Sequence, residues 1–255
     1  MPAITLAEIE GKLSSEDLSE WLTLWHREQG PAKSAALKLM ASAIPSPAGG
    51  MLKALDLCCG PGDAGRALFS RFPHAQIDFL DRDPFFLSLC DAVNRRDGVP
   101  GRTFLRDLIQ PDWPRDLRND YDVVTVANGL HWLTPALALN VFTDIHDLVR
   151  PGGCLIFMEP VGVEAPFEKG FAEWRAGQPE QHDPENWARF WSRVNALMGF
   201  DYLKQQLGEA PDPSRIGDTL PATGWLRLLS DAGFQRQDIL LRDPEKIVLA
   251  ALKPR

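Results

Sequence analysis

The chain has 255 residues but only four cysteines, at positions 58, 59, 90 and 154. They lack the paired spacing of a zinc site. Cys58 and Cys59 are neighbours on an expected strand, where successive side chains point to opposite faces and cannot converge on one ion. We therefore expect four small, buried apolar side chains and no bound metal.

Long apolar runs and clusters of basic residues are also missing. No segment approaches the ~20 apolar residues that cross a bilayer, and Met1-Pro2-Ala3 opens no signal peptide. The net charge is −8, without a run of lysine or arginine that would bind phosphates. The sequence predicts a cytoplasmic protein with a small-molecule substrate, no nucleic acid partner and no membrane partner.

Short apolar runs alternate with helical segments from Met51 to Glu159. This alternation is typical of βαβ units, and so of a parallel sheet with helices on both faces. Two further runs near the C-terminus predict an antiparallel hairpin. The expected fold is α/β, with a Rossmann-like, mostly parallel sheet of seven strands at 52–57, 75–80, 102–106, 122–127, 153–159, 234–242 and 246–252.

The flanking segments predict helices. Leu18, Trp21, Leu22 and Trp25 recur at helical spacing, and a second helical run, 32–43, ends in a linker rich in proline and glycine. Aromatic residues crowd the stretch from 160 to about 220, which we interpret as a helical insertion. The expected division is an N-terminal helical cap (1–48), a cofactor-binding core (49–160), a lid (161–221) and the rest of the core (222–255).

The segment Ala54–Gly65 reads ALDLCCGPGDAG, a strand, a glycine-rich turn and a helix start. Glycines let a ligand approach backbone N–H groups closely, so the turn predicts a cofactor that carries adenosine. The glycine spacing alone also fits a nicotinamide dinucleotide. Asp56 and Asp63 favour S-adenosylmethionine, because Asp56 can accept bonds from its ammonium group and both acids would repel a pyrophosphate. Asp63 itself is expected to cap the following helix.

The motif DLCCGPG resembles the first motif of the class I S-adenosylmethionine-dependent methyltransferases, with Cys58 where the family usually has glycine. Further motifs follow in the family's order. They are Asp81 after the second strand, Asp107 after the third, 121–128 with 130–132 at the fourth, and 148–153 before the fifth. The resemblance covers residues 50–160 and implies S-adenosylmethionine as the methyl donor and S-adenosylhomocysteine as the product.

The resemblance also implies which side chains hold the cofactor. Asp81 would bind the ribose hydroxyls, and Asp107 would lie near the adenine, although Leu108 or Arg106 could take that place. The full expected set is Asp56, Cys58, Gly60, Gly62, Asp81, Arg82, Asp107, Leu108 and Asn128.

Three residues are candidates for acting on the acceptor. His131 follows the fourth strand, where open α/β sheets present their ligands, and Glu159 ends the fifth strand. His182 lies in the insertion beside Asp183. A histidine near neutral pH suits a base for a hydroxyl or phenol acceptor. The structural alternatives are a hydrogen bond from His131 to a loop carbonyl, a strand-end acid at Glu159 and an exposed loop at His182.

The sequence thus predicts a methyltransferase acting on a small organic molecule, at oxygen rather than nitrogen or carbon. The alternatives are a protein that uses the sulfonium for other chemistry, a binding module without catalysis, and an NAD-dependent oxidoreductase. Trp21 and Trp25 could bury against the core or against a second subunit, so a homodimer stays open.

Overall fold

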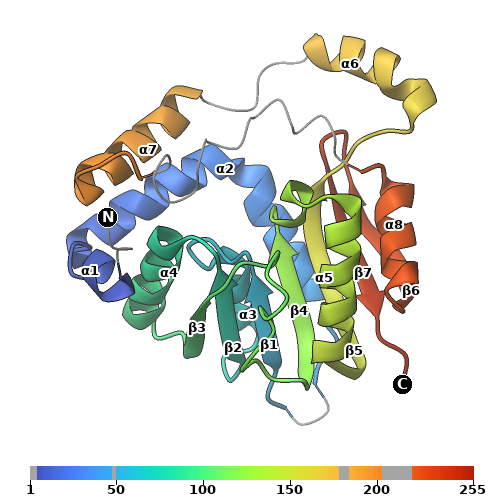
Figure 1. The fold of residues 1–255 in the computed structure, drawn as a ribbon, viewed down its shortest axis with the longest axis horizontal. Helices are drawn as coiled ribbons and strands as arrows, with labels where there is room; N and C mark the ends of the chain where they lie inside the picture. Colours follow the sequence, from blue (N-terminus) through green and yellow to red (C-terminus); the bar gives the residue numbers. More distant parts are fainter. Residues whose placement is uncertain (1–4, 48–49, 178–183, 203–219) are drawn as a thin grey trace.

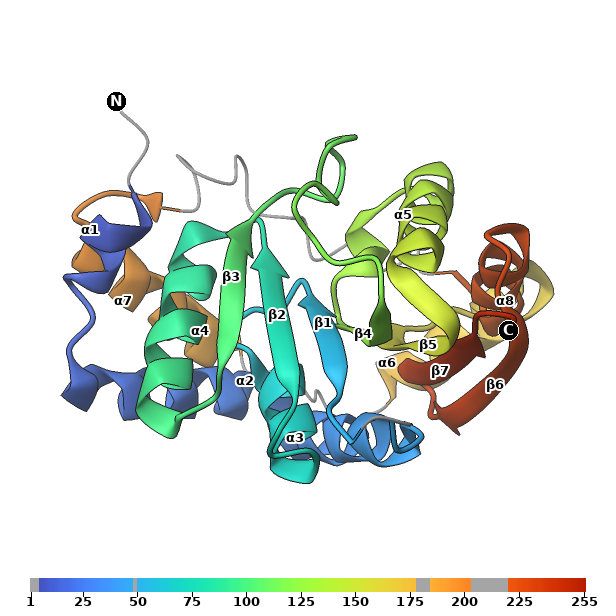
Figure 2. The same cartoon turned by 90° about the horizontal axis from the view of Figure 1, so that it is seen from below.

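The computed structural model describes residues 5–47, 50–177, 184–202 and 220–255. In these ranges seven strands form one sheet in the order β3-β2-β1-β4-β5-β7-β6 (Figures 1 and 2). Strands β1 to β5 pair in parallel, and β7 pairs antiparallel with both β5 and β6. The bounds are β1 Lys53–Leu57, β2 Gln76–Asp81, β3 Gly101–Leu105, β4 Tyr121–Ala127, β5 Val149–Pro160, β6 Gln235–Arg242 and β7 Lys246–Leu252.

The predicted fold class is confirmed, and so is the existence of each expected strand. The strand that differs most is β5, which begins four residues before its expected start because Tyr121 pairs with Val149 across an irregularity in the β4–β5 ladder. The order of the strands across the sheet reverses between β1 and β4. Ligands bind at such a reversal, outside the carboxyl ends of the strands, so the fold itself indicates where to look for the site.

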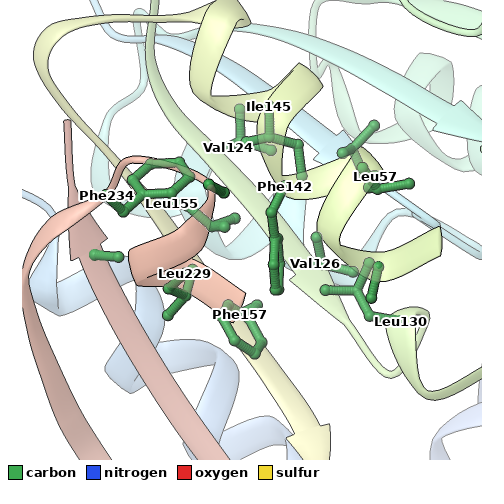
Figure 3. Close-up of a cluster of buried hydrophobic side chains, with 14 of the residues drawn as sticks. Leu57, Val124, Val126, Leu130, Phe142, Ile145, Leu155, Phe157, Leu229 and Phe234 are labelled. Carbon is green, nitrogen blue, oxygen red and sulfur yellow. The ribbon is translucent and has the colours of Figure 1, made fainter. Parts of the chain in front are cut away.

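Helices cover both faces of the sheet. One face packs against α5 (Pro135–Leu148) and α8 (Ala222–Asp231), and Figure 3 shows Phe142 and Phe157 in this cluster. The rings of Phe142, Phe157 and Trp225 are in mutual contact. The other face packs against α3 (Asp63–Arg71), α4 (Pro84–Asp97) and the second half of α2 (Ser15–Ala43). Thr134 caps α5 and Pro135 fills its first position, as the sequence predicts.

The two helices expected near the N-terminus are joined into α2, which changes direction at Gly30. This glycine has φ 67° and ψ 167°, values outside the helical region. A short helix, α1 (Leu6–Glu10), precedes α2 and is held by a capping box between Thr5 and Glu8. The sequence pattern gave no separate signal for α1.

A third buried cluster joins the first half of α2, α4 and α7 (Pro184–Met198). Trp21 is buried there, with its ring edge-on to Phe85 and Phe190. Trp25 also contacts Phe190, and it contacts Trp187. Both tryptophans therefore pack inside this chain. By contrast α6 (Glu168–Ala176), preceded by the short turn η2 (Ala165–Phe167), has no buried residue.

Candidate cofactor and acceptor site

The predicted site residues lie where the parallel strands end. Asp81 at the end of β2 accepts a hydrogen bond from Gly60 N–H at 2.8 Å, which fixes the loop after β1. Its other oxygen accepts from Asp83 N–H at 2.9 Å. Burial raises the pKa of Asp81 despite these bonds. Strand β2 and the glycine loop are therefore held together through one carboxylate.

Asp56 lies beneath the glycine loop and is almost wholly buried. Its Oδ2 accepts from Gly65 N–H at 2.8 Å, and its Oδ1 accepts from the Thr125 hydroxyl on β4 at 3.2 Å. Asp56 therefore joins β1, β4 and the first turn of α3. Thr125 is a supporting residue that the motif reading missed, because its side chain meets Asp56 only through the pairing of β1 with β4.

The glycines of the loop are needed for packing. A Cβ on Gly62 would lie 2.7 Å from Cys90 Sγ, and one on Gly65 would lie 2.2 Å from the Phe79 ring. Gly62 also has φ 87°, which side-chain-bearing residues rarely adopt. On Gly60 the nearest group to an added Cβ is the Trp25 ring, at 3.6 Å. Gly60 is therefore the loop position that faces α2.

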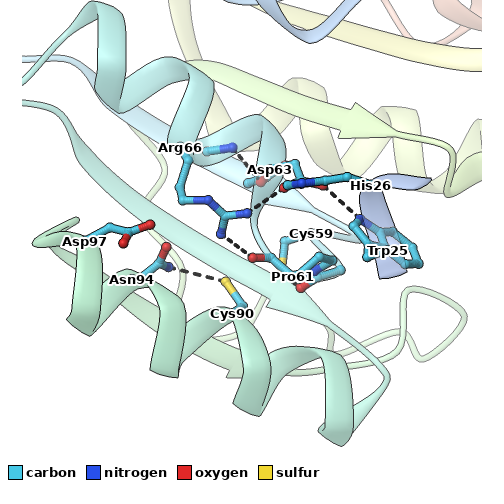
Figure 4. A network of polar contacts seen from close by, with 12 residues as sticks. Trp25, His26, Cys59, Pro61, Asp63, Arg66, Cys90, Asn94 and Asp97 are labelled. Atoms are coloured by element: carbon cyan, nitrogen blue, oxygen red, sulfur yellow. Dashed lines mark hydrogen bonds and ion pairs between the residues drawn. The ribbon is translucent and has the colours of Figure 1, made fainter. Parts of the chain in front are cut away.

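Asp63 does not cap α3, and this expectation is wrong. The N-cap is Gly62, and no side chain caps the helix there. Instead, Asp63 accepts from Trp25 Nε1 at 2.8 Å, lies 3.0 Å from His26 Nε2 and pairs with Arg66 (Figure 4). Burial alone would raise the pKa of Asp63, but the hydrogen bond with His26 and the charge of Arg66 outweigh it and lower the pKa. Asp63 thus fastens α2 to the glycine loop.

The ends of β4 and β5 meet through Glu159, whose side chain is 0% exposed. Its Oε1 accepts from the N–H groups of Gly129 and Leu130 at 2.8 and 2.7 Å. Its Oε2 accepts from His131 N–H at 3.2 Å and lies 2.7 Å from His131 Nδ1. The short turn η1 (Leu130–Trp132) is therefore built around this carboxylate. Two residues predicted as separate candidates form one pair.

The remaining expected residues occupy varied positions. Asn128 has φ 62° and donates its N–H to Met158, and Cys58 has φ 50° at the end of β1. Arg82 Nη1 lies 3.8 Å from Asp107 Oδ2, a contact that joins the ends of β2 and β3. Leu108 is buried and belongs to the core cluster on the α5 side of the sheet. His182 lies outside the described residues.

Gly129 is a further residue that the sequence reading did not single out. A Cβ there would lie 2.4 Å from Cys58 Cβ and 2.6 Å from Cys58 Sγ. The loops after β1 and β4 therefore touch, and the links through Asp81, Glu159 and Arg82 complete a connected edge from β3 to β5. A glycine after a strand-end asparagine is the only sequence sign of this contact.

We expect Gly129→Ala to lower the free energy of unfolding by about 1–3 kcal/mol, the usual cost of overpacking a filled site. The backbone at Gly129 (φ −126°) suits alanine, so the cost is steric. Urea unfolding measures it. The matched control is Gly170→Ala on α6, where an added Cβ meets nothing within 4 Å. Equal stability of the two variants would contradict the loop contact.

Burial of acids at this edge also predicts an unusual pH dependence. Burial raises the pKa of Asp56 to about 7, and burial together with the charge of Asp81 raises that of Asp83 to about 6. In the unfolded chain both titrate near 3.9, so between pH ~4 and 7 the native state binds more protons. Native stability from these groups is therefore highest at the acidic end of that range and falls as pH rises through 6 to 7.

We expect the free energy of unfolding to fall by about 1–3 kcal/mol between pH 5 and pH 8. Asp56→Asn should reduce that slope, because the amide keeps an acceptor for Gly65 N–H and does not ionise. Urea unfolding at four pH values measures both, with Asp147→Asn, an exposed acid, as the control. The same slope in Asp56→Asn and in the control would refute the role of burial.

Comparisons with known proteins agree with this geometry. Residues 54–153 match the family model described as a methyltransferase domain. An uncharacterized methyltransferase of Synechocystis sp. is 27% identical over 148 residues, which cover 58% of this chain and 55% of the relative. A trans-aconitate 2-methyltransferase of Methylobacterium nodulans is 32% identical over 115 residues, covering 45% and 40%. The chain thus spans about half the length of the curated relatives it matches.

Among solved structures, the mitomycin 7-O-methyltransferase superposes with a TM-score of 0.55 at 16% identity, over 98% of this chain and 61% of the other. That identity supports the fold alone. In the parts of this chain that are described, no helix is both long and apolar enough to cross a membrane. Residues 54–153 are thus similar to a methyltransferase domain, and the strand order and strand-end acids agree with the resemblance to the class I S-adenosylmethionine-dependent methyltransferases.

Proposed function

We propose that this chain transfers the methyl group of S-adenosylmethionine to an oxygen atom of a small organic acceptor. The observation that carries the proposal is the connected strand edge, on which Asp81 is fixed beside the glycine loop and His131 is fixed by Glu159. The Asp81 carboxylate suits binding of a ribose, and the His131 ring suits removal of a proton from the acceptor. The edge therefore offers a cofactor side and an acceptor side.

The residues fit the cofactor. Each oxygen of Asp81 accepts one backbone N–H, and a carboxylate has about four acceptor positions, which leaves places for two ribose hydroxyls. Beside it, Asp83 Oδ2 is buried and has no hydrogen-bond partner among the described residues. Asp56 is enclosed by Gly65 and Thr125, so we assign it to holding the loop rather than to contact with the ammonium group.

The bound cofactor would supply a methyl group already activated by its sulfonium, so the protein has to position the acceptor and remove its proton. An ionised Glu159 can only accept, which places a proton on His131 Nδ1. In the neutral ring Nε2 is then an acceptor, able to take the proton of a hydroxyl. Glu159 would stabilise the resulting imidazolium by its charge.

Apolar surface near the pair of His131 and Glu159 favours an acceptor with an apolar part. The Trp132 ring is 49% exposed, with its centre 4.5 Å from that of His131. Beyond β5, an open hollow of about 540 Å³ lies between α6 and the β6–β7 connection, lined by Val163, Phe171, Trp174, Arg242, Asp243 and Pro244. The hollow is linked to the acceptor side along the chain, because Val163 follows Glu159 by four residues.

A carboxylate acceptor is the second candidate, since one relative is a trans-aconitate 2-methyltransferase. A carboxylate is already ionised and needs no base. His131 would then hold the acceptor without accepting a proton. The two candidates differ in whether removal of His131 Nε2 slows methyl transfer.

The proposal is tested by calorimetric titration with S-adenosylmethionine, followed by incubation of the labelled donor with panels of phenols, alcohols, amines and carboxylic acids. We expect micromolar binding and label in products heavier than their acceptors by one CH₂ unit, since the methyl group replaces a proton. Binding without turnover on any panel would favour the binding module. Tight binding of NADH with no binding of S-adenosylmethionine would favour the oxidoreductase.

A further inference from the structure

Helix α2 lies directly against the glycine loop and brings a cation to it. Trp25 and His26 from its first half both reach Asp63, and the Trp25 ring faces Gly60. Helix α2 changes direction at Gly30, and Lys33 then lies near Trp25 again, with its Nζ 4.9 Å from the centre of the Trp25 ring. Figure 4 shows Trp25 and Asp63. Lys33 is 7% exposed.

The charged groups around Lys33 come from four elements. Asp63 on α3, Asp56 on β1, Glu159 on β5 and Lys246 on β7 all act on its ammonium. Burial is the largest influence and lowers the pKa of Lys33 to about 8, even though the three acids oppose it. The ammonium therefore lies in a poorly solvated place beside the Trp25 ring, under the influence of acids at the ends of β1 and β5, and a further anion there would stabilise it.

The order of the strands indicates which anion. If Asp107 lies near the adenine and Asp81 near the ribose, the cofactor runs from β3 over β2, and its amino-acid end continues past β1 toward β4 and β5. That end carries a carboxylate. We propose, building on the proposed function, that Lys33 is a cofactor-binding residue whose ammonium pairs with the methionine carboxylate of S-adenosylmethionine.

The test compares two donors that differ only in that carboxylate, S-adenosylmethionine and its decarboxylated form, by calorimetric titration at pH 7. Lys33→Met should weaken the affinity for S-adenosylmethionine by about 10-fold to 100-fold, the effect of losing a charge-assisted bond. The affinity for the decarboxylated donor should change by less than about 2-fold. Lys33→Arg should recover part of the loss. Lys38→Met, at an exposed lysine of the same helix, is the control.

A pH series adds an independent readout. Binding of S-adenosylmethionine to the wild type should weaken above pH 8 as Lys33 loses its proton, by more than it weakens in Lys33→Met. The cofactor's own amine titrates in both proteins, so the difference between the two curves isolates Lys33. Thermal unfolding should show Lys33→Met at least as stable as the wild type, because methionine fills a similar volume without a buried charge.

Three results would overturn the inference. Equal weakening of both donors in Lys33→Met would mean that Lys33 only supports α2, and unchanged affinity for both would remove any role in binding. If neither donor nor 5′-methylthioadenosine binds the wild type, the proposed function fails as well, and this inference fails with it. The first two results leave the proposed function standing.

Discussion

Asp81→Ala is expected to weaken binding of S-adenosylhomocysteine by about 100-fold or more, which corresponds to about 2.7 kcal/mol. The reason is the loss of two hydrogen bonds between a buried carboxylate and the ribose hydroxyls, each worth about 1.5–3 kcal/mol when one partner is charged. The release of Gly60 N–H from Asp81 adds to the effect by loosening the loop. Calorimetric titration of the purified variant measures the change.

A ligand pair separates ribose contact from loop support. The 2′-deoxy analogue of S-adenosylhomocysteine should bind the wild type more weakly than the parent compound, yet bind Asp81→Ala with the same affinity as the parent. Asp147→Ala, at an exposed acid, should change neither ligand. Were Asp81→Ala still to prefer the 2′-hydroxyl ligand as strongly as the wild type, the ribose assignment would be wrong.

The sheet could be predicted because its signals are local. The inner parallel strands β1, β2, β4 and β5 are mostly buried and so appear as short apolar runs, and turn residues separate these runs from helices of ordinary length. Asp56 and Asp81 lie at strand ends for the same reason. The start of β5 differs from the prediction, because the early pairing of Val149 with Tyr121 depends on a neighbouring strand.

The contacts that make the site were not local, and the sequence left them open. Glu159 and His131 are 28 residues apart, and only the pairing of β4 with β5 brings them together. Asp63 looked like a helix cap because it begins a helix, yet its partners Trp25 and His26 lie 38 and 37 residues earlier in the chain. Such bonds follow from the packing of whole helices on the sheet, which residue spacing does not encode.

Tyr202 is a similar case beside the proposed ribose acid. Its hydroxyl donates to Asp83 Oδ1 at 2.8 Å and accepts from Phe85 N–H at 2.9 Å, across 119 and 117 residues. Burial and the charge of Asp83 raise the pKa of this phenol, so it stays a donor. The segment after α7 is therefore tied to the start of α4, two residues past the proposed ribose acid. The sequence predicted a helical lid but not this attachment.

The second large effect is expected at His131. With a hydroxyl acceptor found in the donor panel, His131→Ala should lower kcat by about 10²–10⁴-fold, the usual contribution of a positioned general base. His131→Asn should lower it as much, because the amide nitrogen can replace Nδ1 as the donor to Glu159 but nothing replaces Nε2. Steady-state assays with labelled donor measure both variants.

The asparagine variant distinguishes proton transfer from support of the loop. If His131 only orders the turn at 129–131, His131→Asn keeps the bond to Glu159 and should retain most of the activity, whereas a base requires both variants to be equally slow. Binding of S-adenosylhomocysteine should be unchanged in both, since the cofactor side is held by Asp81. Full activity of either variant would exclude proton removal by His131 and favour a carboxylate acceptor, which is ionised before it binds.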